Sequence, residues 1–127
     1  MKIKIKFFEN NFVEAIKAGI YEIYIKVNGK EKLIYIGESV FVLVRCATNL
    51  YEIAKGNGYL GFNEEKIEND NITLVFKLYE SIADKEIRKK KEKELIAKKC
   101  PRMQSGISDR VKSIENMIDE LTNLLNE

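Results

Sequence analysis

The chain contains no histidine and no tryptophan, and it has only one proline and two cysteines in 127 residues. Without histidine it cannot form the usual Ser-His-Asp or Cys-His nucleophile systems. Cys46 and Cys100 are too few for a four-ligand Cys/His zinc site, and we expect both to be free thiols in a reducing cytoplasm. Acid–base chemistry must therefore come from Glu, Asp, Tyr or Lys, or from a hard metal ion that carboxylates hold.

Long apolar runs are also missing. No run approaches the roughly 20 residues that a transmembrane helix needs, and residues 1–8 alternate charged and apolar side chains, unlike a signal peptide. We therefore expect neither a membrane span nor a signal peptide. The length, with 45% apolar and 33% charged residues, fits a single folded domain over residues 1–127.

The formal net charge of +2 conceals two regions of opposite sign. Residues 85–99 carry eight basic and three acidic side chains, a net charge of +5, whereas residues 105–127 have a net charge of −3. A local basic stripe can bind phosphates even when the whole chain is nearly neutral. Mixed Lys and Glu residues also keep ordinary exposed helices soluble, so composition alone leaves both interpretations open.

Hydrophobic periodicity predicts an α/β chain of the α+β kind, with a small three-stranded antiparallel sheet flanked by helices. Strands are predicted at residues 20–27, 33–37 and 72–79, where apolar side chains alternate or cluster, and Asn28-Gly29 is a hairpin signal. Residues 2–8 are predicted to form a further short strand, and residues 10–17 a helical turn.

Three helices are expected. Val40 to Val44 would favour a strand by β-branching, but the helical spacing of the apolar residues that follow favours a helix over 39–54. Residues 55–71 are predicted to be a polar loop, and residues 81–99 a helix with Ser81 as its N-cap.

The last predicted helix covers residues 107–126 and is amphipathic. Its apolar residues follow each other at steps of four and three, as in a heptad seam: Ile107, Val111, Ile114, Ile118, Leu121 and Leu125. The seam is shorter than three heptads, so a helix packed on its own domain and a homodimer contact both remain open.

Two tripeptides mark the predicted hairpin. Its first strand opens with Gly19-Ile20-Tyr21, and its second strand ends with Tyr35-Ile36-Gly37. Arg45 follows eight residues after Gly37, in the predicted helix. Taken singly, each has an ordinary structural explanation, because tyrosines in strands are usually packing residues.

The basic helix carries a second pattern. Glu92 is followed at fixed intervals by Leu95-Ile96, Pro101 and Gln104. A helical Glu with Arg88 one turn before it is usually a surface pair worth a few tenths of a kcal/mol. Together with the two tripeptides and the arginine, however, the pattern becomes specific.

This set resembles the GIY-YIG nuclease family over about residues 19–104, with residues 105–127 as an added helix. The resemblance implies a divalent-metal-dependent endonuclease that hydrolyses DNA phosphodiester bonds. Glu92 would hold Mg²⁺ or Mn²⁺, and Arg45 would bind the scissile phosphate. Tyr21 would assist or perform deprotonation of water, and Tyr35 would orient water or phosphate.

Three positions depart from the family pattern. Glu38 follows the second tripeptide, Asn49 stands where several relatives carry His, and Gln104 replaces the closing Asn. With Gly37, these residues are expected to line the site. The departures keep an alternative open, a GIY-YIG-fold module that binds nucleic acid or a protein without cutting.

Nucleic-acid binding is predicted for the basic helix, through Arg88, Lys89, Lys90 and Lys93. The hairpin register decides whether Tyr21 and Tyr35 share a face. A two-residue loop would place them on opposite faces. We therefore predict either a three-residue loop, residues 28–30, or a β-bulge that restores the parity.

Overall fold

The computed structural model describes residues 1–104. The predicted helix at 107–126 and its apolar seam lie outside the described residues. The elements, in chain order, are β1 (Lys4–Phe7), η1 (Glu14–Ile16), β2 (Gly19–Val27), β3 (Lys30–Ser39), α1 (Val42–Ala54), η2 (Tyr59–Gly61), α2 (Glu64–Ile67), β4 (Ile72–Ser81) and α3 (Lys85–Lys99).

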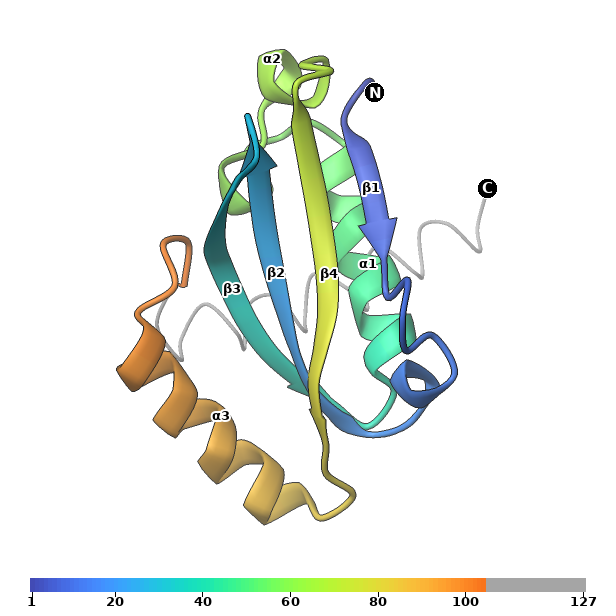
Figure 1. The fold of residues 1–127 in the computed structure, drawn as a ribbon, viewed down its shortest axis with the longest axis vertical. Helices are drawn as coiled ribbons and strands as arrows, with labels where there is room; N and C mark the ends of the chain where they lie inside the picture. The colour runs from blue at the N-terminus through green and yellow to red at the C-terminus, as the bar shows by residue number, and fades with distance from the viewer. Residues whose placement is uncertain (105–127) are drawn as a thin grey trace.

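The sheet has four strands in the order β1-β4-β2-β3 (Figure 1). Strand β4 pairs antiparallel with β2, and β2 with β3, but β1 pairs parallel with β4. The expected three-stranded antiparallel sheet is therefore wrong, and the α+β class is confirmed. Ile5 and Phe7 alternate with lysines in β1 and pack against the core, so joining the edge of β4 removes their apolar side chains from water.

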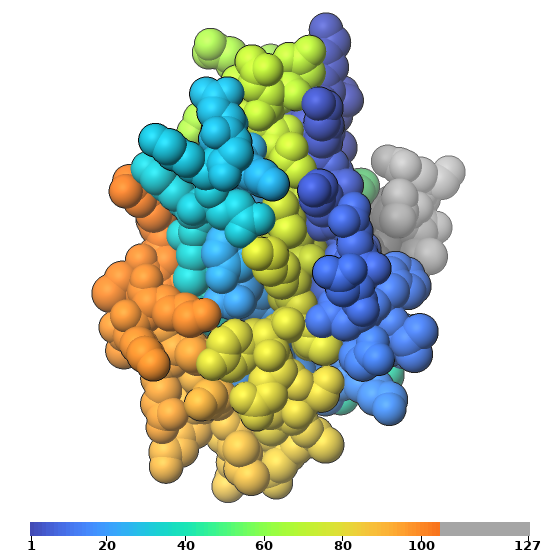
Figure 2. Space-filling view, in the orientation of Figure 1, coloured from blue at the N-terminus to red at the C-terminus, as the bar shows by residue number. Residues whose placement is uncertain are grey.

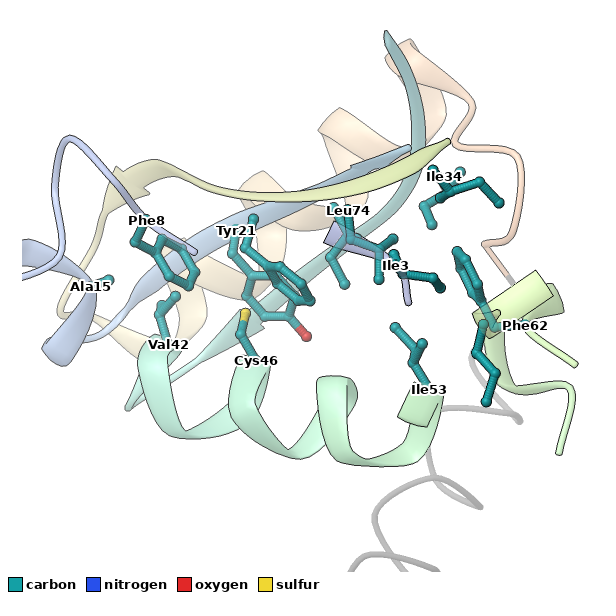
Figure 3. Packing of buried hydrophobic residues seen from close by; sticks show 14 residues of the cluster. Ile3, Phe8, Ala15, Tyr21, Ile34, Val42, Cys46, Ile53, Phe62 and Leu74 are labelled. Carbon is teal, nitrogen blue, oxygen red and sulfur yellow. The ribbon is translucent and has the colours of Figure 1, made fainter. Parts of the chain in front are cut away.

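The two main helices lie on opposite faces of the sheet. Val42, Cys46 and Ile53 of α1 point toward the sheet and pack in the main core with Tyr21 and Leu74 (Figure 3). Helix α3 lies along β3 on the other face (Figure 1), where a smaller cluster joins Leu95 to Ile20 and Ile36. Successive side chains of β2 and β3 point to opposite faces of the sheet, so the apolar residues of these strands are divided between the two clusters.

Helix α1 confirms the helix predicted over 39–54. Helix α3 begins later than predicted, because Ser81 still belongs to β4 and pairs with Gly19. Its N-cap is Asp84, whose Oδ1 accepts a hydrogen bond of 2.9 Å from the Ile87 backbone N–H. The predicted loop at 55–71 is also partly wrong, because it contains η2 and a short α2 that Asn63 caps.

The hairpin turn has two residues, so the predicted three-residue loop is wrong. Asn28 and Gly29 both have positive φ, 53° and 78°, as a tight turn between twisted strands requires. The alternative is confirmed, because a bulge opposite Ile23 and Tyr24 inserts Ile34 into β3 and pairs Ile23 with Tyr35. Tyr21 and Tyr35 consequently lie on the same face of the sheet.

Candidate functional site

Gly37 makes room for the ring of Tyr21. The two residues are cross-strand partners, and a Cβ built on Gly37 would lie 2.3 Å from the Tyr21 hydroxyl oxygen. Any side chain at position 37 would therefore force the tyrosine ring out of its place. Gly19 is restricted in a similar way, because a Cβ there would lie 2.6 Å from the carbonyl oxygen of Glu80.

The two predicted catalytic tyrosines lie next to each other. Their ring centroids are 6.2 Å apart, and the rings are tilted by 34°. Tyr21 is 1% exposed and belongs to the main core, whereas Tyr35 is half-buried. One ring of the pair therefore lies in the core, and the other lies at a more accessible position on the edge strand β3.

Helix α1 contributes Asn49, which is buried and bonded to two tyrosines. Its Nδ2 donates a hydrogen bond of 2.9 Å to the Tyr21 hydroxyl, and its Oδ1 accepts one of 3.1 Å from the Tyr59 hydroxyl. Asn49, which the sequence predicts to line the site, therefore contacts Tyr21 directly. Tyr59 was not predicted, and no sequence signal marked it within an apparently polar loop.

Burial dominates the electrostatics of Tyr21. It raises the pKa of the phenol well above its ordinary value, with smaller increases from Tyr35 and Cys46. The positive charge of Arg45 and the hydrogen bond from Asn49 act in the opposite direction on this pKa. Tyr21 is therefore a neutral phenol at pH 7. Its hydroxyl accepts a hydrogen bond from the Asn49 amide, and the positive charge of Arg45, also in α1, partly lowers its pKa.

Arg45 is half-buried on α1, one helical turn before Asn49. Its charge also lowers the pKa of the Cys46 thiol, although burial keeps that pKa well above the ordinary value. Arg45 thus supplies positive charge to the side of the sheet that holds the two tyrosines.

Glu92 lies on the buried side of α3, between Arg88 and Leu95, and its exposure is 0%. That side packs mainly on β3, the strand that also carries Tyr35. Within residues 1–104, no group of three or more His, Cys, Asp or Glu side chains could hold a metal ion. A Mg²⁺ ion held by Glu92 would therefore not have two further His, Cys, Asp or Glu ligands from residues 1–104.

Glu38 and Arg88 bind each other across the β3–α3 contact. Arg88 Nε and Glu38 Oε2 are 2.6 Å apart, and Arg88 also donates to the carbonyl oxygens of Ile82 and Ala83. Arg88 is 4% exposed, so it joins two elements inside the domain instead of presenting its charge to solvent. Among the residues predicted to bind nucleic acid, Lys89, Lys90 and Lys93 are exposed.

Gln104 lies at the outer edge of the sheet. Its Oε1 accepts a hydrogen bond of 2.8 Å from the backbone N–H of Ile36. The two residues before it donate their backbone N–H groups to Leu33 and Ile34. The segment after α3 therefore covers part of the free edge of β3, which protects that edge from pairing with another chain.

Comparisons with protein-family models, with curated proteins and with solved structures give no match for this chain. In the part of the chain that the structure describes, no helix has the length and apolar character needed to cross a membrane. Both cysteines are free thiols, Cys46 buried and Cys100 exposed.

Proposed function

We propose that the chain is a GIY-YIG-type endonuclease that hydrolyses DNA phosphodiester bonds with the help of a divalent metal ion. The observation that carries the proposal is the pair Tyr21 and Tyr35, side by side on the face that α1 covers with Arg45 and Asn49. A buried phenol and a half-buried phenol near the charge of a guanidinium can accept protons from water and bind phosphate oxygens, and this chemistry needs no histidine.

Arg45 is assigned to the scissile phosphate, because its planar guanidinium can donate to two phosphate oxygens at once. A water oxygen forms the new bond to phosphorus, the bond to the leaving sugar oxygen breaks, and solvent protonates that oxygen. Ionised Tyr21 accepts the proton of the attacking water. The raised pKa of Tyr21 makes this phenolate scarce at neutral pH but strongly basic when it forms.

Glu92 is assigned to Mg²⁺ or Mn²⁺, because a carboxylate is a hard oxygen ligand. The ion would polarise the phosphate and stabilise the leaving oxygen. The exposed Lys89, Lys90 and Lys93 on α3 would hold the DNA backbone without reading its sequence.

A plasmid-nicking assay with Mg²⁺ tests the proposal. Glu92→Gln keeps the shape of the side chain but removes its charge, and it should abolish most cleavage. The matched control is Glu94→Gln, two residues along the same helix on its exposed side, which should cut at the wild-type rate. The proposal fails if wild-type protein does not nick DNA with Mg²⁺ or Mn²⁺, or if Glu92→Gln retains full activity.

The alternative is a module of the same fold that binds nucleic acid or a protein without cutting. The pairing of Glu38 with Arg88 and the complete burial of Glu92 favour it, because both leave fewer accessible charged groups near β3. Fluorescence anisotropy with labelled DNA separates the two. Binding that depends on Lys89, Lys90 and Lys93, without cleavage, supports the alternative. Either function fits a reducing cytoplasm.

A further inference from the structure

Helix α1 carries apolar side chains on both of its sides. The side that faces the sheet holds Val42, Cys46 and Ile53 (Figure 3). The outward side continues the apolar character from Val40, before the helix, through every turn to the end of α1. We call these residues the outer stripe, and all of them are exposed: Val40, Val44, Ala47, Tyr51 and Ala54.

The outer stripe has heptad spacing, with steps of four, three, four and three residues. That is the spacing with which one helix contacts another along a shared seam. Val40, Val44 and Tyr51 are 58%, 63% and 45% exposed, so large apolar side chains are exposed just before the helix and in two of its turns. Contiguous apolar surface of this kind marks an interaction site.

The patch widens at the N-terminal end of α1. Phe41 is 54% exposed there, and the adjoining η1 region adds Phe12, Val13 and Ile16, which are also exposed. A backbone hydrogen bond from Val42 N–H to the Lys17 carbonyl holds this region against the start of α1. Figure 2 shows the other face of the sheet, the one that α1 does not cover, where the side chains of β4 (yellow) reach the surface.

The sequence supplies a matching stripe in residues 107–125. The steps of its six apolar residues are four, three, four, three and four, the same alternation as in the outer stripe. As a helix it would be about 27 Å long, enough to cover α1, whose 13 residues span roughly 20 Å. Leu121, Leu124 and Leu125 make its far end the most strongly apolar part.

The described chain ends beside the C-terminal end of α1. Met103 lies against Gly61 of η2, since a Cβ on that glycine would be 3.2 Å from the Met103 Cε. Element η2 in turn packs on α1, and its Tyr59 is bonded to Asn49. A helix that starts just after Gln104 can therefore run back along α1 from its C-terminal end to its N-terminal end.

We propose that residues 107–125 form a helix that packs antiparallel on the outer stripe of α1 in the same molecule. The leucine-rich end of this segment then reaches the wider patch around Phe41 and Ile16. Packing of this kind adds a third layer to the domain, outside α1. The proposal does not depend on the proposed nuclease activity.

Hydrogen exchange measured by mass spectrometry on the full chain tests the proposal. Amides of residues 105–127 should exchange at least about tenfold more slowly in wild-type protein than in Ala47→Glu, which places a charge in the middle of the outer stripe. The matched control is Ala97→Glu, an exposed alanine of α3, which should keep the wild-type protection. Protected amides in β2 and β4 report that each variant is folded.

A second variant tests the contact from the other side. Ile118→Glu leaves residues 1–104 unchanged and should also remove the protection of residues 105–127. Protection should be equal at two protein concentrations that differ about twentyfold, because a contact within one molecule does not depend on mass action. Protection that grows with concentration together with a dimer mass, protection unaffected by Ala47→Glu, or no protection in wild-type protein would each overturn the proposal.

Discussion

The two faces of the sheet hold their buried polar groups in different ways. On the α1 face, Tyr21, Asn49 and Tyr59 form a chain of neutral hydrogen bonds. On the α3 face, ion pairs take this place, with Glu38 bonded to Arg88 and Glu22 bonded to Lys99 at 2.8 Å. On the α1 face the charge of Arg45 lowers the pKa of Tyr21, whereas on the α3 face the ion pairs attach α3 to the sheet.

Arginine therefore has a different role on each face of the sheet. Arg88 is almost fully buried and makes hydrogen bonds to a carboxylate and to two carbonyl groups. Arg45 is half-buried and acts electrostatically on Tyr21 and Cys46. The difference indicates that Arg88 attaches α3 to the edge of the sheet, whereas Arg45 changes the electrostatics around the buried phenol of Tyr21.

The largest effect is expected from breaking the buried pair on the α3 face. Arg88→Met removes a buried cation from its ion pair with Glu38, whose side chain is 10% exposed, which should lower the free energy of unfolding by about 3–5 kcal/mol. Urea denaturation followed by circular dichroism measures this change. Lys89→Met, the exposed neighbour, serves as the control and should change stability by less than about 0.5 kcal/mol. Equal effects of the two substitutions would contradict the anchoring role.

On the α1 face, Gly37→Ala should have the next largest effect. The new Cβ would occupy the space of the Tyr21 ring, so the ring must move or the strands must separate, at a cost of about 1–3 kcal/mol. The same denaturation experiment measures it, with Lys32→Ala at an exposed position of β3 as the control. A stability of Gly37→Ala equal to that of Lys32→Ala would show that the ring of Tyr21 adapts freely.

Arg45→Lys separates function from stability. If Arg45 clamps a phosphate, an ammonium group that keeps the charge but loses the two-pronged geometry should lower the nicking rate by about tenfold or more. The unfolding midpoint should stay close to that of wild type, because Arg45 is only half-buried. Near-normal cutting by the lysine variant would remove Arg45 from the proposed mechanism.

The elements that the sequence predicts well are those with local signals. Alternation along 20–27 and 72–79 predicted β2 and β4, and the spacing of apolar residues predicted α1 despite its β-branched start. The need for the two tyrosines to share a face predicted either a three-residue loop or a β-bulge; the bulge is confirmed and lies in β3, and the three-residue loop is wrong. Asn28-Gly29 adopts the tightest turn, and Ile34 restores the parity instead.

The features that escaped prediction depend on contacts between distant residues. Strand β1 joins β4 in parallel, and Glu38 meets Arg88 across 50 positions of the sequence. Neither contact has a signal in its own segment. Tyr59 follows Gly58, whose positive φ of 97° is ordinary for glycine, but the contact of Tyr59 with Asn49 across the fold has no signal in the loop itself. Ser81 and Asp84 are both good N-caps, and the sheet decides between them.

The smallest expected effect compares the two faces at alkaline pH. On the α3 face, burial and the nearby Glu22 carboxylate raise the pKa of Tyr24 to about 12. Because this folded pKa lies above the ordinary value near 10, the unfolded chain ionises first as the pH rises. The stabilisation is therefore complete below pH about 10 and is lost progressively as the pH rises toward about 12.

Tyr24→Phe should remove this contribution. Between pH 9 and pH 11.5 the unfolding free energy of the variant should therefore fall less steeply than that of wild type. The difference between the two slopes should correspond to the release of about one proton on unfolding. Urea titrations at several pH values measure the slope, and Tyr51→Phe at an exposed position is the control. On the α1 face, Tyr21 is buried more deeply, and its pKa is raised in the same direction. Tyr21→Phe should therefore also flatten the alkaline slope. The opposite result would be a slope that Tyr24→Phe flattens and Tyr21→Phe does not. It would mean that the phenol of Tyr21 ionises as easily in the folded chain as in the unfolded chain, which would contradict the neutral hydrogen-bond chain of Tyr21, Asn49 and Tyr59 on the α1 face.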